Sequence, residues 1–369
     1  MPATYWDYLQ LDSLLALQGG LERDENELSN DELRFITIHQ IDELWMKVAL
    51  RELESARDLF KRDHVPETAL SSAAQGLRRI QIVFELMADH FRLMETMRTR
   101  DYLEFRDKLS PASGFQSAQM RELEILMGLE ESQRIPFGGE KSHLRALEGP
   151  TGDSTALQKV KRRLAEPETL KSAVYRWLSR APIDGSVPGD DNDDEVVAKY
   201  IDRFLDSQRR GQEQRIAEVL EHQALEPSDH ERLKARYEQE LQGSAAWLRA
   251  EDVDDEADRR LQRRLRAALL FIESNRDLAL LSWPGEILDN LVACEQASVI
   301  FRQRHARMVE RVIGRRVGTG GSAGVDYLDE TALRYRVFPE VWQVRGILTR
   351  AELDPEISNE DTYGLRFER

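Results

Sequence analysis

Two histidines of this sequence lie in apolar helical stretches, where an imidazole could bind a metal or an aromatic ligand. His39 lies in residues 35–40 (FITIHQ), and His305 lies in residues 301–309 (FRQRHARMV). The sequence has no His-x3-His, no His-Glu-x2-His and no cysteine pair, so a zinc site has no support. A single helical histidine can still be the axial ligand of a heme. Taken alone, either residue is more simply interpreted as an ordinary core histidine.

Two pairs of residues, each four positions apart, could bind an aromatic amino acid. Phe35 and His39 share a helix face, so a ring beside a neutral imidazole could hold a flat ligand that carries an N–H donor. Tyr102 and Arg106 have the same spacing, and a phenol beside a planar guanidinium favours carboxylate binding. The alternative for the second pair is a surface arginine stacked on a tyrosine.

A glycine-rich segment, residues 318–324 (GTGGSAG), follows a predicted helix. Its four glycines allow tight turns and let backbone N–H groups approach a ligand closely. The segment lacks the lysine of a phosphate-binding loop and follows a helix rather than a strand, so nucleotide binding is not indicated. The alternative interpretation is a flexible linker, although the sequence on both sides is rich in apolar residues.

The elements that must position these residues are predicted to be helices, so the predicted fold class is all-α. Charges recur every few residues, and alternating strand-like runs are missing. Ser29 and Glu32 form a capping-box pattern at the start of the first clear helix. The early helices are expected over about 29–62, 67–99, 100–109 and 116–129. The middle of the chain is richer in charge, and its loop at 182–195, with an acidic tail, is expected to be flexible.

Composition limits the partners and the location of the protein. With 52 basic and 68 acidic side chains the net charge is −16, which disfavours nucleic acid and anionic membranes. We expect no membrane span and no signal peptide. The single cysteine, Cys294, is predicted to be a packed thiol, which fits a cytoplasmic location. Most of the other histidines lie among charged residues and are expected at the surface: His64, His90, His143, His222 and His230.

Four separate motifs together resemble the tryptophan 2,3-dioxygenase family. They are residues 5–12 (YWDYLQLD), 35–47 (FITIHQIDELWMK), 109–117 (LSPASGFQS) and 304–322, from Arg-His to the glycine-rich segment. The resemblance covers about 1–130 and 266–350. Several motifs in the right order are far more specific than any one of them.

The resemblance implies a heme b cofactor, with His305 as the axial ligand of its iron. It assigns Phe35 and His39 to the other side of the pocket, with neutral His39 as the catalytic residue that accepts a hydrogen bond from the indole N–H. Tyr102 and Arg106 match the residues that bind the substrate carboxylate. The implied substrates are L-tryptophan and O2.

Further pocket residues are implied at the edge of the site. Thr319 matches a residue that contacts the substrate ammonium group, and Ser113 matches a small polar pocket residue. The N-terminal segment of the family reaches into the site of a neighbouring subunit, which assigns a pocket role to Tyr5, Tyr8 and Leu9. A homotetramer is implied as well.

The fold that the resemblance implies is a heme-containing helical bundle of the indole dioxygenase type with an additional helical insert. We predict that 1–130 forms the N-terminal part of the catalytic domain, 131–265 a charged insert acting as a lid or interface, and 266–369 the C-terminal part. The implied reaction cleaves the C2–C3 bond of the indole and gives N-formyl-L-kynurenine. The alternatives are a relative that oxygenates a modified tryptophan or another indole, and a non-catalytic heme-binding protein.

Overall fold

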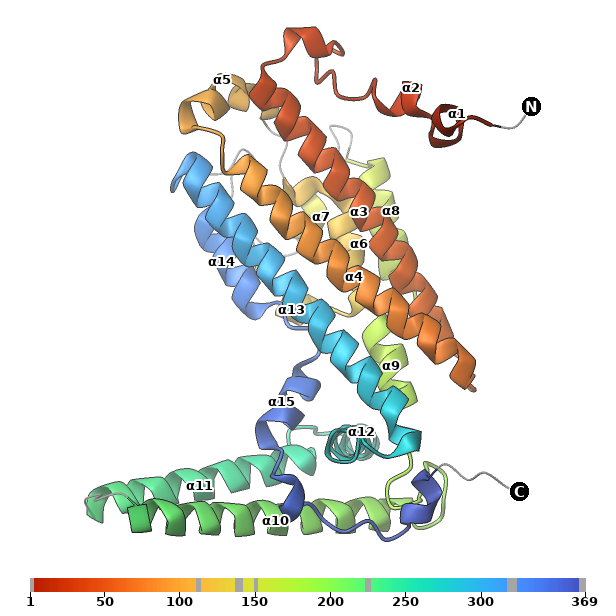
Figure 1. Ribbon diagram of the computed structural model, residues 1–369, viewed down its shortest axis with the longest axis vertical. Helices are drawn as coiled ribbons and strands as arrows, with labels where there is room; N and C mark the ends of the chain where they lie inside the picture. The colour runs from red at the N-terminus through yellow and green to blue at the C-terminus, as the bar shows by residue number, and fades with distance from the viewer. Residues whose placement is uncertain are drawn as a thin grey trace. The chain divides into compact units, whose positions relative to one another are not determined.

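The computed structural model describes residues 3–110, 114–136, 142–148, 152–222, 227–316 and 324–364 (Figure 1). Within these ranges the chain is built from α-helices and short 3-10 turns, and strand pairing is limited to one bridge between Ile183 and Ser186. The predicted all-α fold class is therefore confirmed. In the same ranges, none of the helices combines the length and the apolar character that crossing a lipid bilayer requires.

The helices follow one another along the chain with short connections. Their bounds are α1 Tyr5–Leu9, α2 Leu11–Leu14, α3 Asn30–Phe60, α4 Glu67–Met94, α5 Thr99–Leu109, α6 Ala118–Met127, α7 Ser142–Arg145, α8 Thr155–Leu164, α9 Leu170–Leu178, α10 Asp193–His222, α11 Pro227–Leu248, α12 Glu256–Ser274, α13 Ala279–Ile313, α14 Val325–Arg334 and α15 Pro339–Ile347.

The chain divides into two compact units. The first comprises Met1–Arg57, Gln75–Leu170 and Ala293–Val337, and the second comprises Asp58–Ala74, Lys171–Val292 and Phe338–Arg369. This division reflects which residues pack together and does not assign a function to either unit. The three functional segments predicted from the sequence, 1–130, 131–265 and 266–369, stay a prediction.

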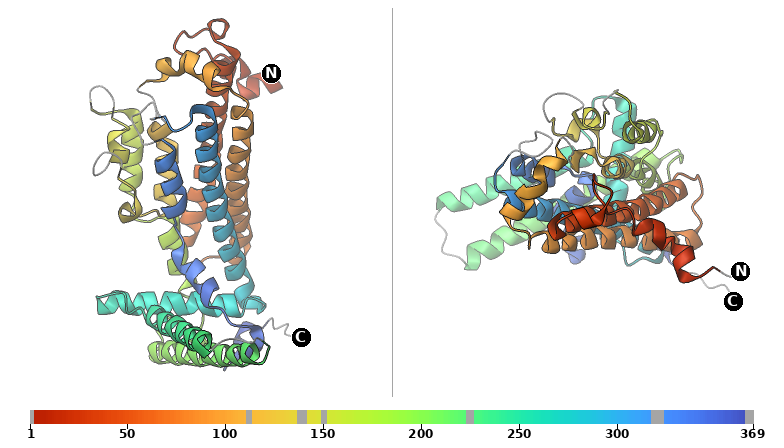
Figure 2. Two further views of the ribbon diagram at one scale, coloured as in Figure 1. Left: turned by 90° about the vertical axis from the view of Figure 1, so that its left-hand side faces the viewer. Right: turned by 90° about the horizontal axis from the view of Figure 1, so that it is seen from above.

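The core of the first unit is organised around α4, which lies between α3 and α13 (Figures 1 and 2). The buried side chains of α4 recur every three or four residues, which places them on one face of the helix: Leu77, Ile80, Phe84, Met87 and Phe91. The same helix holds the one cysteine in place, because Cys294 of α13 is buried and its thiol donates to the Leu77 carbonyl at 2.9 Å. The prediction of a packed thiol is confirmed.

The start of α3 and the end of α4 differ in detail from the predicted elements. The Ser29 hydroxyl accepts a hydrogen bond from the Glu32 N–H at 3.1 Å, as a capping box requires. The Glu32 carboxylate, however, accepts from Lys108 Nζ at 3.0 Å, so it is engaged by another helix. Helix α4 ends at Met94 rather than near residue 99, because the Thr96 hydroxyl donates to the Leu93 carbonyl and competes with helical pairing.

In the second unit, α10 and α11 run side by side as an antiparallel pair (Figures 1 and 2), joined in part by a hydrogen bond from Gln208 to Ser244 at 3.1 Å. The loop before α10 is not the flexible segment that its composition predicts. Ser186 is buried and donates to Asp193, which is also buried and pairs with Arg264 at 3.2 Å. The acidic tail is therefore ordered by a buried arginine, a long-range contact that local composition does not reveal.

Candidate functional site

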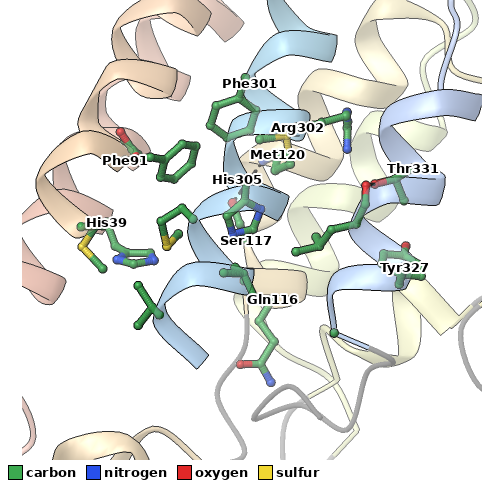
Figure 3. Close-up of a pocket in the computed structure, with 18 of the residues that line it drawn as sticks. His39, Phe91, Gln116, Ser117, Met120, Phe301, Arg302, His305, Tyr327 and Thr331 are labelled. Carbon is green, nitrogen blue, oxygen red and sulfur yellow. Dashed lines mark hydrogen bonds between the residues drawn. The ribbon is translucent and has the colours of Figure 1, made fainter. Parts of the chain in front are cut away.

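The first unit encloses a cavity of about 520 Å³ between helices α3, α4, α5, α6, α13 and α14 (Figure 3). In Figure 3, His39 projects from one side, His305 lies near the centre, and Tyr327 and Thr331 lie on the other side. Most of the wall is apolar or aromatic: Phe35, Met46, Phe91, Met94, Met120, Phe301, Met308, Val309, Val312, Ile313 and Leu328. A cavity of this size and lining suits a large, flat organic ligand.

His305 lies on α13 beside two aromatic rings, Phe91 and Phe301, which also contact each other at 5.4 Å between centroids. Its imidazole stacks on Phe91 at 5.2 Å between ring centroids, with an interplanar angle of 21°, and on Phe301 at 6.3 Å and 16°. Burial lowers the pKa of His305 to about 4, because the surroundings disfavour the charged ring. At neutral pH the ring therefore keeps a lone pair, as an iron ligand must.

His39 lies on α3, and its ring orientation follows from one hydrogen bond. Its Nδ1 is 2.7 Å from the Phe35 carbonyl oxygen. Because a carbonyl only accepts, Nδ1 carries a proton, and in the neutral form of the ring Nε2 is left as an acceptor. The Phe35 and His39 rings lie 4.1 Å apart, as their spacing predicts. The pair therefore offers a ring face and an acceptor nitrogen at the cavity wall.

Helix α5 brings Tyr102 to the cavity, where its ring packs against Phe105 at 5.3 Å. Burial raises the pKa of the Tyr102 phenol, and the neighbouring Arg106 offsets part of this shift. Arg106 thus lies beside Tyr102, as their spacing predicts. The cavity wall, as far as the described residues form it, includes Tyr102 but not Arg106.

One edge of the cavity carries a buried cluster of charges that sequence reasoning missed. Glu124 of α6 is paired with Arg121 at 3.0 Å, with Arg134 at 2.7 Å and with Arg302 at 2.7 Å. Burial would raise the pKa of Glu124, but the three arginines lower it to about 2. Arg121 and Arg302 line the cavity, and Arg121 Nε is buried with no hydrogen-bond partner in the described part of the chain. This edge is therefore cationic and favours an anionic ligand.

A second polar pair was also missed. His90 was predicted to lie at the surface, but its Nδ1 is 2.7 Å from Oδ1 of Asp42, which is buried and lines the cavity. The surface prediction holds only in part for His90, whose side chain is 25% exposed, because the ring also faces α3. Asp42 follows His39 by three residues on a predicted helix, and this spacing was the one available signal.

The structure brings four of the predicted site residues to one cavity: Phe35, His39, Tyr102 and His305. Three others lie on the exposed helix α1, where Tyr5 is 76%, Tyr8 80% and Leu9 42% exposed. Their predicted role needs a neighbouring subunit and stays a prediction. Ser113 and Thr319 lie outside the described residues.

An all-α fold with a largely apolar cavity, a neutral imidazole at its wall and a cationic edge suits a large aromatic ligand that carries anionic groups. The comparisons with known proteins identify the family. The family model for tryptophan 2,3-dioxygenase matches residues 2–348, and the chain belongs to this family. The resemblance seen in the sequence is confirmed, and so is the assignment of the chain as an oxidoreductase of this family.

Several similar proteins are named after this family. A tryptophan 2,3-dioxygenase of Sorangium cellulosum is 53% identical over 367 residues, which cover 99% of this chain and 88% of that protein. Tryptophan 2,3-dioxygenase 2 of Ralstonia nicotianae is 48% identical over 371 residues, which cover 100% of this chain and 99% of that protein. A tryptophan 2,3-dioxygenase-like protein of Xanthomonas campestris is 48% identical over 276 residues, which cover 74% of this chain and 99% of that protein. The segment 131–265 thus has a counterpart in the Ralstonia relative.

The surroundings of His305 predict how the stability of the heme-free protein depends on pH. Folding lowers the pKa of this ring from 6.5 to about 4, so the unfolded chain takes up a proton first as the pH falls. The stability that the neutral ring supports is complete above about pH 6.5 and declines as the pH falls toward about 4. Denaturant unfolding at several pH values measures the decline, which we expect to be smaller in His305→Leu. An equal decline in both proteins would contradict this assignment.

Proposed function

We propose that this protein is a heme-dependent dioxygenase that cleaves the C2–C3 bond of the indole ring of L-tryptophan and yields N-formyl-L-kynurenine. The observation that carries the proposal is the placement of neutral His305, Phe35, His39 and Tyr102 around one cavity in a chain of this family. The names of the similar proteins favour L-tryptophan over a modified indole.

The cavity residues fit heme b. His305 would hold the iron, because burial keeps its ring neutral. The aromatic and aliphatic wall suits the macrocycle. Nε of Arg121, which has no hydrogen-bond partner among the described residues, lies on a residue that lines the cavity together with Arg302 and suits the carboxylate groups of heme. When bound, heme would supply the iron that activates O2, while the protein's own side chains bind and orient the amino acid.

The substrate would be oriented by groups at both of its ends. Nε2 of His39 is the acceptor that an indole N–H requires, and Phe35 offers a ring face beside it. Tyr102 and Arg106 would bind the carboxylate, with Thr319 at the ammonium group and Ser113 as a polar pocket residue. Fixing both ends of the amino acid places the indole in a single orientation, which lowers the entropic barrier to reaction.

We also propose a cytoplasmic homotetramer in which α1 of one subunit reaches the site of another. The exposure of Tyr5, Trp6 and Tyr8 supports this arrangement, since Trp6 too is 46% exposed. Large exposed aromatic side chains grouped on one short helix are typical of a surface that another chain covers. Light scattering of the full chain, and of a variant with Tyr5, Trp6 and Tyr8 changed to serine, tests the arrangement.

The proposed activity is tested by anaerobic reduction of the heme-loaded protein, followed by addition of L-tryptophan and O2. The expected product is heavier than L-tryptophan by two oxygen atoms, and both atoms carry the label when ¹⁸O2 is used. A product with one added oxygen would favour oxygenation without ring cleavage. A protein with bound heme and no product would support a non-catalytic heme-binding role.

Changing His39 to alanine is expected to lower kcat/KM for L-tryptophan by about tenfold while heme stays bound, since one neutral hydrogen bond is lost. Steady-state kinetics and the absorption spectrum of the same preparation measure the two effects. His39→Gln, which keeps an acceptor, is expected to lose less. Loss of heme in His39→Ala would mean that the roles of His39 and His305 are reversed.

A further inference from the structure

A buried carboxylate in the cavity wall has no role in the proposed function. Asp42 of α3 lines the cavity and its side chain is 9% exposed. One of its oxygens accepts a hydrogen bond from Nδ1 of His90, on α4, at 2.7 Å. Most of the surrounding wall is apolar, so a leucine at this position would avoid the cost of burying a charge.

His90 orients Asp42 and favours its ionised form. Burial raises the pKa of the Asp42 carboxyl, and the hydrogen bond from His90 opposes that shift. An ionised carboxylate only accepts hydrogen bonds, and its two oxygens together can accept about four. Because His90 engages Oδ1, the carboxylate keeps the capacity to accept a donor from a ligand in the cavity.

The neighbouring acid differs from Asp42 in burial, because Glu43 is only partly buried. Glu43 also lines the cavity, but Gln119 donates to its carboxylate at 2.6 Å and to its backbone carbonyl at 2.7 Å. One turn further along α3, Met46 continues the wall with an apolar side chain. Asp42 is therefore the more buried of the two acids, and its hydrogen-bond partner lies on α4.

The position of Asp42 relative to His39 indicates which ligand donor it could meet. The two residues are three apart on α3, a rise of about 4.5 Å along the helix, and both line the cavity. An indole whose N–H bonds to His39 is flat and extends its six-membered ring away from that nitrogen by a similar length. When the ring lies along α3 in the direction from His39 to Asp42, the edge of its six-membered ring comes within reach of the Asp42 carboxylate.

We propose that Asp42, oriented by His90, is a specificity-determining residue that lets the cavity accept indole amino acids with a hydroxyl or amino group on the six-membered ring. This inference rests on the proposed function, because it takes the indole to be bound by His39. A ring hydroxyl would donate to the carboxylate of Asp42, whereas L-tryptophan leaves that acceptor to water. His90 is the positioning residue of the pair.

The test compares ligands on the heme-loaded, full-length protein without O2. Dissociation constants of L-tryptophan and of 5-, 6- and 7-hydroxy-L-tryptophan are measured by calorimetry and by the change in the heme spectrum. The ratio of the constant for L-tryptophan to that for the best hydroxytryptophan is the discrimination. We expect Asp42→Leu to lower this discrimination about tenfold to a hundredfold, the effect of one hydrogen bond to a charged acceptor.

Matched variants separate recognition from packing. Asp42→Asn keeps an acceptor oxygen and is expected to lose less discrimination than Asp42→Leu. His90→Gln keeps a donor to Asp42 and is expected to retain the discrimination, whereas His90→Leu loses it. Met46→Leu changes the same wall, removes only the weak sulfur acceptor that Ser117 contacts at 3.8 Å and leaves both carboxylates in place, so it serves as the control with discrimination unchanged.

Three results would overturn the proposal. The first result is measured on the wild type alone: every hydroxytryptophan binds at least tenfold more weakly than L-tryptophan. The second is unchanged discrimination in Asp42→Leu, which would make the pair only a tether between α3 and α4. If that variant does not fold, unchanged discrimination in both Asp42→Asn and His90→Leu is the third. Turnover of L-tryptophan by the wild type is scored separately, so failure of the proposed function is distinguished from failure of this inference.

Discussion

The variant His305→Ala is expected to lose the Soret absorption of bound heme and all measurable conversion of L-tryptophan. The reason is that the proposed iron ligand is a single imidazole, which burial keeps neutral and which packs against Phe91 and Phe301. No other histidine in the described wall except His39 could replace it. Absorption spectra after heme reconstitution, with circular dichroism to establish folding, measure the effect.

Added imidazole provides the control for this variant. An alanine at position 305 leaves space for a free imidazole, which is expected to restore part of the heme absorption without restoring a normal rate. Phe91→Leu keeps the ligand and removes the stacking ring, so heme should remain bound there. Normal heme content in folded His305→Ala would show that the iron is held elsewhere.

The variant Arg106→Ala is expected to raise the KM for L-tryptophan about a hundredfold while heme content stays normal. The loss corresponds to the paired hydrogen bonds between a guanidinium and a carboxylate. In the structure Arg106 lies against Tyr102 rather than at the cavity wall, so its side chain would have to turn toward the substrate. Steady-state kinetics with saturating O2 measure KM and kcat separately.

Two comparisons sharpen the result for Arg106. Arg106→Lys keeps the charge but not the planar pair of donors, so it should recover only part of the affinity. Tryptamine, which lacks the carboxylate, should bind wild type and Arg106→Ala about equally. An unchanged KM in Arg106→Ala, or an equal loss of affinity for tryptamine, would contradict the carboxylate clamp.

Much of the fold could be predicted from local sequence. The capping serine at Ser29, the break before residue 111 and the regular apolar spacing along α4 locate the early helices closely. These signals arise within a few residues of the chain, where hydrogen bonding and helix periodicity decide the structure. The end of α4 and the loop before α10 were placed or described wrongly, because Thr96 and the buried pair Asp193–Arg264 override composition.

The candidate site was predictable in the residues that carry the family motifs and in Tyr102, whose spacing to Arg106 indicated a carboxylate site. Phe35, His39 and His305 were found through the order of several motifs, since each alone has a simpler structural interpretation. The pair Asp42–His90 spans 48 residues and the contact of Arg302 with Glu124 spans 178, so neither leaves a local pattern. Such contacts depend on how α3, α4, α6 and α13 pack, which is a property of the folded chain.

The buried thiol of Cys294 can serve as a built-in probe of local opening between α4 and α13. Burial raises the pKa of that thiol to about 12, so the reactive thiolate is scarce while α4 and α13 stay packed. The chain has no other cysteine, so the rate of alkylation at neutral pH reports how often α4 and α13 separate and expose Cys294. The same helices carry Phe91 and His305. In the wild-type protein, the factor by which added heme slows alkylation would therefore measure how much bound heme stabilises the packing of α4 against α13.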